Sequence, residues 1–328
     1  MDHRTPLAAL LALAVAGTLA GSTAAAAPAG DPPAAAKPAA PAAPVYDEKA
    51  DAAKDIERAL ATAKLDHSRV LIQWGANWCG WCKMLHALTT GDQEIAKELR
   101  DQYVVVHVDV GRFDKHMAIA ERYGADLKKN GLPFLTVLDE NGAPVVNQET
   151  SSLEKPQGSD PPGHDKAKVM AFLTKHQAPA VKADDLLAAG VAKAKAEGKL
   201  VFLHFGAPWC GWCRKLEAWM ARPEVHAILD KAFVDVKIDT ERMTGGQAML
   251  TAHSAGKNGG IPWFEFVDGA GKALVNSNGP KGNTGYPSAP EEIAWFMQMI
   301  HTAGAKLGAE DLAALEASLA AKPVTPAK

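Results

Sequence analysis

The pentapeptide WCGWC occurs twice, at residues 78–82 and 209–213, and it contains all four cysteines of the 328-residue chain. The flanking sequence repeats as well, because VLIQWGANWCGWCKML from Val70 corresponds to VFLHFGAPWCGWCRKL from Val201. Two later pairs keep the same order, YVVVHVDV with FVDVKIDT and NGLPFLTVLDENGAPVVN with GGIPWFEFVDGAGKALVN, while the offset drifts only from 131 to 129 residues. This conserved order indicates a tandem duplication of one folding unit.

Both copies show the same succession of predicted elements. A helical pattern comes first, at residues 47–64 and 184–197, and a short apolar run that ends in glycine follows, as expected of a buried strand, at 70–74 and 201–205. The motif then opens a helix. Further strands are expected at 103–110, 135–138 and 145–146 in the first copy and at 233–239, 264–267 and 274–275 in the second. Closing helices are expected at 166–176 and 291–301, and a further helix is expected at 309–322, packed either on the second unit or on the seam between the units.

The first residues differ in composition from both copies. Arg4, an apolar run over residues 7–20 and small residues near 24–26 predict a secretory signal at residues 1–26. The apolar run is too short for a membrane span, so we expect an exported protein, periplasmic or secreted, with no membrane association after cleavage. Residues 27–44 are almost entirely alanine and proline and predict a disordered linker. The two units are then expected at 45–178 and 179–322, with a tail at 323–328.

The charges give no sign of a polyanionic partner. The formal net charge is −3, and lysine, arginine and acidic residues are interspersed along the chain. Such a pattern is typical of a solvated surface rather than of a nucleic-acid interface.

The spacing of the cysteines predicts redox chemistry. A cysteine at a helix N-terminus lies at the positive end of the helix dipole, which favours its thiolate, so Cys79 and Cys210 are the predicted nucleophiles. Cys82 and Cys213, one helical turn further on, are close enough to resolve a mixed disulfide. The expected partners are thiols or disulfides of protein substrates and an unidentified redox partner protein. No cofactor beyond these disulfides, and no metal, is expected.

The strand, the CxxC pair at a helix start, the crossover to a second strand and the Gly-apolar-Pro sequence before a hairpin resemble the thioredoxin superfamily. The resemblance covers both copies and implies an α/β fold of two tandem thioredoxin-like domains, each with a central mixed β-sheet flanked by helices. The segments after the motif are similar to the thioredoxin-like group that has an extra short helix.

The resemblance also implies a substrate-binding groove. The family's cis-proline maps onto Pro133 and Pro262, and the preceding residues, Leu132 and Ile261, would offer their backbone to an extended substrate. The motif tryptophans would place large apolar faces beside the sulfurs; they are Trp78, Trp81, Trp209 and Trp212. For Trp78 and Trp209, packing in the core is an equal alternative.

Two departures from the family pattern bear on mechanism. Thioredoxins proper carry a buried aspartate six residues before the first motif cysteine, and here that position holds Gln73 or His204. Histidine can act as a base near neutral pH and glutamine cannot, so His204 is a candidate proton relay, with a hydrogen-bonded core histidine as the alternative. The dipeptide Gly-Trp is neither the Gly-Pro of thioredoxins nor the Gly-His of protein disulfide isomerases. It leaves the direction of electron flow open, with a preference for reduction or exchange.

Other readings of the cysteines stay open. The chain could be a binding or chaperone module that uses the tryptophan-lined groove, with its cysteines locked as inert disulfides. The thiols could instead bind a soft metal such as copper(I). A zinc site shared by the two pairs is disfavoured, because over a hundred residues separate them and each lies in its own strand-turn-helix unit.

Overall fold

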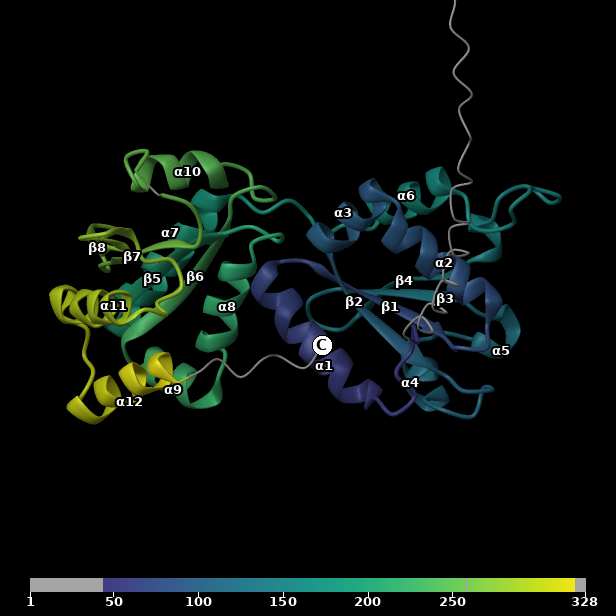
Figure 1. The fold of residues 1–328 in the computed structure, drawn as a ribbon, viewed down its shortest axis with the longest axis horizontal. Helices are drawn as coiled ribbons and strands as arrows, with labels where there is room; N and C mark the ends of the chain where they lie inside the picture. Colours follow the sequence, from purple (N-terminus) through teal and green to yellow (C-terminus); the bar gives the residue numbers. More distant parts are fainter. Residues whose placement is uncertain (1–43, 258, 322–328) are drawn as a thin grey trace, which may run out of the picture. The chain divides into compact units, whose positions relative to one another are not determined.

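The computed structural model describes residues 44–257 and 259–321 (Figure 1). Its main elements form two α/β units that follow one another along the chain, each around a four-stranded sheet flanked by helices. The predicted fold class of two tandem α/β domains is therefore confirmed. The predicted signal, the predicted tail and all of the predicted linker except Pro44 lie outside the described residues.

In the first domain, β1 (Arg69–Gly75) is an inner strand of the sheet. It runs parallel to β2 (Tyr103–Asp109) and antiparallel to β3 (Phe134–Leu138), which pairs in turn with β4 (Pro144–Glu149). The strand order is β2-β1-β3-β4. Because β1 has one parallel and one antiparallel neighbour, the sheet is mixed, as predicted.

Helices cover both faces of this sheet. Alternate residues of β1 point to opposite faces, and each set packs against a different helix. Ile72 and Trp74 share an apolar cluster with Ile56 of α1 (Ala52–Asp66), whereas Leu71 belongs to a second cluster with Leu85 of α2 (Gly80–Gly91). The other helical segments of this domain are α3 (Gln93–Gln102), α4 (Met117–Arg122), α5 (Leu127–Asn130), the 3-10 turn Ser151–Leu153 and α6 (Lys166–Lys175).

The second domain repeats this topology. Its sheet has the order β6-β5-β7-β8, with β5 parallel to β6 and antiparallel to β7. The strands are β5 (Leu200–Gly206), β6 (Phe233–Asp239), β7 (Trp263–Val267) and β8 (Ala273–Asn276), with a small ribbon of β9 (Asn278–Gly279) and β10 (Gly282–Asn283). The helices are α7 (Ala183–Glu197), α8 (Gly211–Met220), α9 (Pro223–Ala232), α10 (Gly246–His253), α11 (Pro290–Ala303) and α12 (Ala309–Ala320).

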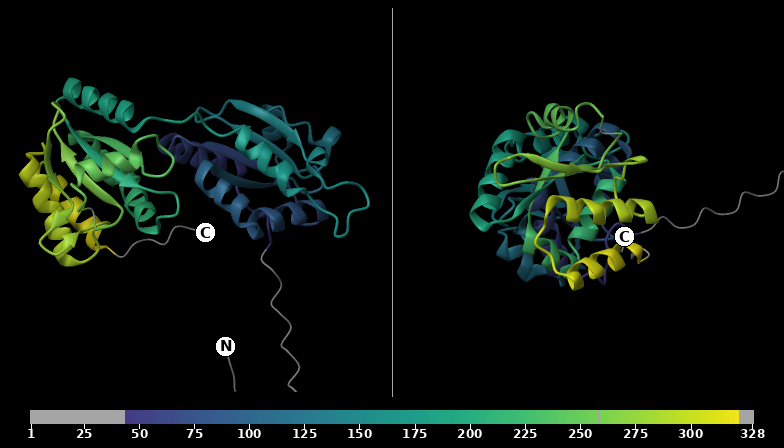
Figure 2. Two further views of the ribbon diagram at one scale, coloured as in Figure 1. Left: turned by 90° about the horizontal axis from the view of Figure 1, so that it is seen from above. Right: turned by 90° about the vertical axis from the view of Figure 1, so that its left-hand side faces the viewer.

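The last helix, α12, packs on the second domain. Leu315 and Leu319 join the same buried cluster as Phe296 of α11, and the two helices lie side by side in two views (Figures 1 and 2). Trp219 Nε1 donates a hydrogen bond of 2.9 Å to Ser318 Oγ of α12. The helix predicted at 309–322 is thus part of the second domain's core.

The first predicted helix was placed too early. We expected it from residue 47, whereas α1 begins at Ala52, after the N-cap Asp51, whose side chain accepts a hydrogen bond from Lys54 N. Asp47 instead accepts from Lys49 N at 2.9 Å and stabilises a turn. Aspartate favours both settings, and its presence alone does not distinguish them.

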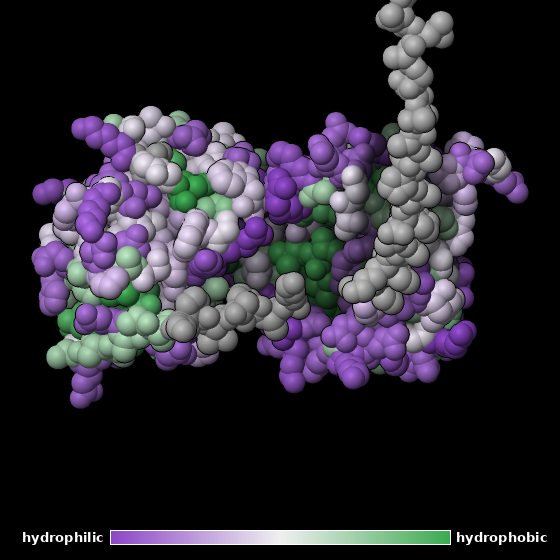
Figure 3. Space-filling model, in the orientation of Figure 1, coloured by the Kyte–Doolittle hydropathy of each residue, from purple (hydrophilic) through white to green (hydrophobic). Residues whose placement is uncertain are grey.

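Hydrophilic side chains spread over much of the face seen in Figure 3, with smaller apolar areas between them. This distribution agrees with the interspersed charges of the sequence.

Candidate active site

Each cysteine pair lies where an inner strand leads into a helix. Cys79 is the N-cap residue of α2, and Cys210 is the N-cap residue of α8. In each copy the backbone N–H of the second cysteine, Cys82 or Cys213, donates a hydrogen bond of 3.1 Å to the sulfur of the first. The two cysteines of each pair form a disulfide.

This position favours negative charge on the leading sulfur. The helix dipole and the unpaired N–H groups of the first turn both stabilise a thiolate at Cys79 or Cys210. The leading cysteines also keep slightly more exposed surface, 5% and 4%, against 1% for Cys82 and 2% for Cys213. This small difference agrees with the leading cysteine as the predicted nucleophile.

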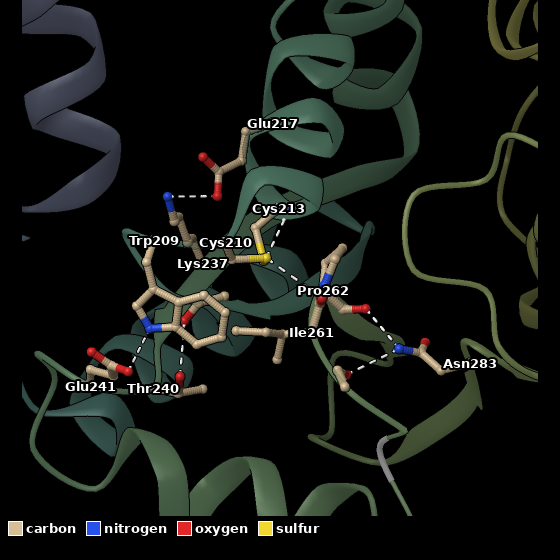
Figure 4. Close-up of a disulfide and its surroundings, with 12 residues drawn as sticks. Trp209, Cys210, Cys213, Glu217, Lys237, Thr240, Glu241, Ile261, Pro262 and Asn283 are labelled. Carbon is tan, nitrogen blue, oxygen red and sulfur yellow. Dashed lines mark hydrogen bonds and ion pairs between the residues drawn. A yellow bond between two sulfur atoms is a disulfide. The ribbon is translucent and has the colours of Figure 1, made fainter. Parts of the chain in front are cut away.

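Three of the four motif tryptophans lie at the surface rather than in the core. Trp78 is 48% exposed, and Trp209 and Trp212 are each 52% exposed. Trp209 is oriented by its Nε1, which donates a hydrogen bond of 2.6 Å to Glu241 Oε1 (Figure 4). Their indole faces add accessible apolar surface beside the disulfides, which suits a protein substrate.

Trp81 differs from the other three, because it is half-buried. Its ring meets His164 edge-on, with 5.6 Å between the ring centroids. His164 is buried, and burial lowers the pKa of its imidazole to about 4. The side chain is therefore neutral near pH 7, and its ring packs against Trp81.

The proline loop of the second copy lies against the disulfide (Figure 4). The Ile261–Pro262 peptide bond is cis, and Cys210 Sγ lies 3.5 Å from Ile261 O. Asn283 Nδ2 donates a hydrogen bond of 3.0 Å to Pro262 O and holds the loop from behind. The structure therefore brings Ile261 and Pro262 together with the nucleophile.

The first copy has the same arrangement with a different support. The Leu132–Pro133 bond is cis, and Leu132 packs against the cluster that contains both cysteines. Thr150 Oγ1 donates a hydrogen bond of 2.7 Å to Pro133 O. Leu132 and Trp81 of the predicted groove thus pack beside the disulfide of this copy, whereas Trp78 Nε1 donates a hydrogen bond of 2.6 Å to Gly111 O.

A carboxylate lies behind the resolving cysteine of the second copy. A Cβ atom added to Gly206 would lie 3.3 Å from Cys213 Sγ and 3.8 Å from Glu217 Oε1, so both atoms border the same small space. Glu217 pairs with Lys237 Nζ of β6 at 2.7 Å (Figure 4), and Lys237 Nζ also contacts Asp66 Oδ1 at 2.6 Å. An ion-paired carboxylate therefore borders the same space as the sulfur of Cys213.

The structure places the candidate relay His204 in a different contact. Its side chain is buried, and Nε2 lies 2.9 Å from Asp235 Oδ1, an ion-pair distance without the geometry of a hydrogen bond. Glu217, which the sequence analysis missed, borders the Cys213 sulfur instead. The sequence does contain an indication of Glu217, because a residue four positions after Cys213 lies on the same side of the helix.

The first copy has a tyrosine in the corresponding place. A Cβ atom on Gly75 would overlap the hydroxyl of Tyr46 and lie 2.9 Å from Cys82 Sγ. Tyr46 is 1% exposed and clusters with both cysteines. No local sequence pattern links Tyr46 to a motif so much later in the chain, so its place beside Cys82 becomes visible only in the structure.

Two imidazole rings replace the charged pair in the first copy. His86 stands where the second copy has Glu217, and His107 stands where it has Lys237; their ring centroids lie 5.5 Å apart. Burial, with a smaller contribution from His86, lowers the pKa of His107 to about 4. The two resolving cysteines therefore have different electrostatic surroundings.

Residues 44–257 and 259–321 contain no group of three or more His, Cys, Asp or Glu side chains arranged to hold a metal ion. No helix among them has the length and apolar character needed to cross a membrane.

The chain is similar in sequence to two curated proteins. It is 28% identical over 165 residues to protein disulfide-isomerase 2-3 of Arabidopsis thaliana, which covers 45% of this chain and 34% of that protein. It is 36% identical over 80 residues to the thioredoxin-like protein slr0233 of Synechocystis sp., covering 24% of this chain and 66% of that protein. The chain thus spans about a third of the first relative's length and less than two thirds of the second's.

A solved structure is similar as well. The disulphide isomerase from Xylella fastidiosa Temecula1 shares 28% sequence identity over 41% of this chain and 97% of that chain, with a TM-score of 0.36. The thioredoxin-like family model matches residues 51–140 and 182–269, which is more than half of the chain and one match in each domain. The chain therefore belongs to the thioredoxin-like family.

Proposed function

We propose that the chain is an exported thiol-disulfide oxidoreductase that reduces or exchanges disulfides of protein substrates through two CxxC sites. The observation that carries the proposal is the N-cap position of Cys79 and Cys210, where each sulfur accepts an N–H bond and is flanked by exposed indole surface. Membership of the thioredoxin-like family supports it, as does the similarity to a protein disulfide-isomerase.

The reaction would proceed in two exchange steps. In the reduced protein, the thiolate of the leading cysteine attacks a substrate disulfide, forms a mixed disulfide and releases one substrate thiolate. The resolving cysteine then attacks the leading sulfur, forms the intramolecular disulfide and releases the second substrate thiolate. Two electrons pass from the dithiol to the substrate, and the two thiol protons end on the released sulfurs. The same steps in reverse oxidise a substrate dithiol.

Insulin reduction with dithiothreitol tests this activity. We expect the parent chain to accelerate the reaction, and we expect Cys79→Ser combined with Cys210→Ser to abolish the acceleration. In a separate variant, Cys82→Ser with Cys213→Ser should accumulate mixed disulfides with substrate proteins through the leading cysteines. A parent chain with no activity and no trapped substrate would contradict the proposal and favour a binding module.

We infer export from residues 1–26, which have the composition of a secretory signal. A periplasmic or secreted location suits a protein with paired cysteines. Cell fractionation with N-terminal sequencing of the mature protein tests it. Recovery of the uncleaved chain in the cytosol alone would contradict export while leaving the redox chemistry untouched.

A further inference from the structure

The segment before α1 is attached to the first active site by the motif loop itself. Asn77, two residues before Cys79, accepts a hydrogen bond from Tyr46 N at 3.1 Å and donates one to Tyr46 O at 2.8 Å. Its Nδ2 also donates to Glu48 Oε1 at 3.1 Å. The second copy has Pro208 at the position of Asn77, and a proline side chain forms no such bonds. The attachment is therefore specific to the first site.

These bonds place the phenol of Tyr46 against the disulfide. Its hydroxyl lies above the Cα of Gly75, beside Cys82 Sγ, in a space that only a glycine at position 75 leaves open. The hydroxyl is buried and makes no hydrogen bond within the described residues. A buried hydroxyl without a partner is unfavourable, and such groups in native proteins call for an explanation.

The surroundings keep this hydroxyl protonated. Burial, and to a smaller extent the negative charge of Asp109, raise the pKa of Tyr46 far above its usual value. The other titratable groups nearby are His107, whose ring lies edge-on to Tyr46 at 5.7 Å, His86 behind His107, and Lys115, whose Nζ lies 3.2 Å from Asp109 Oδ2. The phenol therefore remains a hydrogen-bond donor over the pH range in which thiols exchange.

We propose that Tyr46 is a catalytic residue of the first site, whose hydroxyl donates a hydrogen bond to the Cys82 sulfur when that sulfur becomes negatively charged. When a thiolate attacks Cys79, a new sulfur–sulfur bond forms, the Cys79–Cys82 bond breaks, and its electron pair leaves on Cys82. The O–H proton stays on Tyr46 throughout. In the reverse step the same bond stabilises the Cys82 thiolate that attacks the mixed disulfide.

The role is the same in both directions, because charge develops on Cys82 during opening and is present there during closing. A leaving thiol of lower pKa leaves faster, so the hydrogen bond accelerates opening. Among the described residues, the nearest side-chain oxygen or nitrogen in the corresponding space beside Gly206 is Oε1 of Glu217, and this carboxylate accepts hydrogen bonds and cannot donate one. A negative charge on the resolving sulfur would thus be stabilised by a hydrogen-bond donor at the first site and opposed by a carboxylate at the second. This inference rests on the proposed exchange chemistry at Cys79.

The direct test measures the pKa of Cys82 as the only thiol of the full chain. Cys79, Cys210 and Cys213 are replaced by serine, and the ultraviolet absorbance of the thiolate is followed against pH. A hydrogen bond to a charged group of ordinary strength predicts a thiolate population about 10- to 100-fold smaller after Tyr46→Phe, which is about one to two pKa units. The matched control is Tyr103→Phe, because the buried Tyr103 hydroxyl donates instead to Leu173 O at 2.6 Å, away from the cysteines.

A second measurement uses the native first-site cysteines with only Cys210 and Cys213 replaced by serine. We expect Tyr46→Phe to slow the opening of the Cys79–Cys82 disulfide by reduced glutathione about tenfold, and Tyr103→Phe to leave it unchanged. A Cys82 pKa and an opening rate that are both insensitive to Tyr46→Phe would overturn the inference. A parent chain whose disulfide does not exchange with glutathione would instead contradict the proposed function, and the pKa comparison would remain interpretable.

Discussion

Removing the charge of Glu217 should lower the pKa of Cys213. The substitution Glu217→Gln keeps the size of the side chain but replaces the carboxylate that borders the Cys213 sulfur. A nearby negative charge opposes ionisation of a thiol, so its loss favours the thiolate. Lys237 remains in place in the variant, because its Nζ is also held by Asp66 at 2.6 Å.

The size of the effect follows from the geometry around Gly206. Because one point lies 3.3 Å from Cys213 Sγ and 3.8 Å from Glu217 Oε1, the two atoms are no more than about 7 Å apart. At about 7 Å and an effective dielectric constant of about 20, Coulomb's law gives about 2.4 kcal/mol, or about 1.7 pKa units. The Glu217 side chain is 14% exposed, so water screens part of this field. We therefore expect the pKa of Cys213 to fall by about one unit.

The assay follows thiolate absorbance against pH in a chain with Cys213 as its only cysteine. The control is Glu224→Gln on α9, an exposed residue of the same type, which should leave the curve unchanged. A Cys213 pKa that stays the same or rises after Glu217→Gln would refute this account of the second site.

Two further predictions concern the first domain. Asn77→Ala removes the bonds to Tyr46 and should cost about 1–3 kcal/mol of local stability, seen as faster hydrogen exchange over residues 44–48 with unchanged exchange in α7. Equal hydrogen-exchange protection of residues 44–48 in parent and variant would contradict a stabilising role of the bonds between Asn77 and Tyr46. The pKa values of His107 and His164 are lowered to about 4 in the folded chain, mainly by burial. In the unfolded chain each imidazole has its ordinary pKa of about 6.5, so between these two values the unfolded chain binds protons that the folded chain does not. Stability should therefore fall as the pH drops from about 6.5 towards 4, by up to about 1.4 kcal/mol per unit for each histidine. The urea midpoint should drop less between pH 7 and pH 5 in the His107→Gln, His164→Gln double variant, and equal drops would contradict the assignment.

The repeat predicted most of the architecture. The apolar runs that end in Gly75 and Gly206 became the inner strands β1 and β5, because a strand covered on both faces needs apolar residues at successive positions. The hairpin turns followed from their glycine-containing sequences, and β4 and β8 lie where they were expected. The start of α1 was wrong, since Asp47 and Asp51 are both suitable caps and only the packing of the chain distinguishes them.

The candidate site was predicted less completely. The cysteines, the tryptophans and the residues of the proline loop could be named because they recur in the same order in both copies. Duplication does not reveal the groups in which the copies differ. Tyr46 reaches the first site only through tertiary contacts. Glu217 lies four residues after Cys213, so the sequence places it on the same side of the helix, but only the structure shows that both side chains border one space beside Gly206. Residues that distinguish two homologous sites are found from their contacts, not from the shared pattern.

The hydrogen bonds between Asn77 and Tyr46 bear on where an expression fragment of the first domain should begin. The first stretch of sequence shared with the family begins at residue 51, after the tyrosine. An expression fragment trimmed to that boundary would retain the whole motif and every strand of the sheet, yet it would lack the phenol that borders Cys82. The reactivity of such a fragment would be that of a first active site without Tyr46. Any fragment meant to represent the amino-terminal half should therefore begin no later than Pro44.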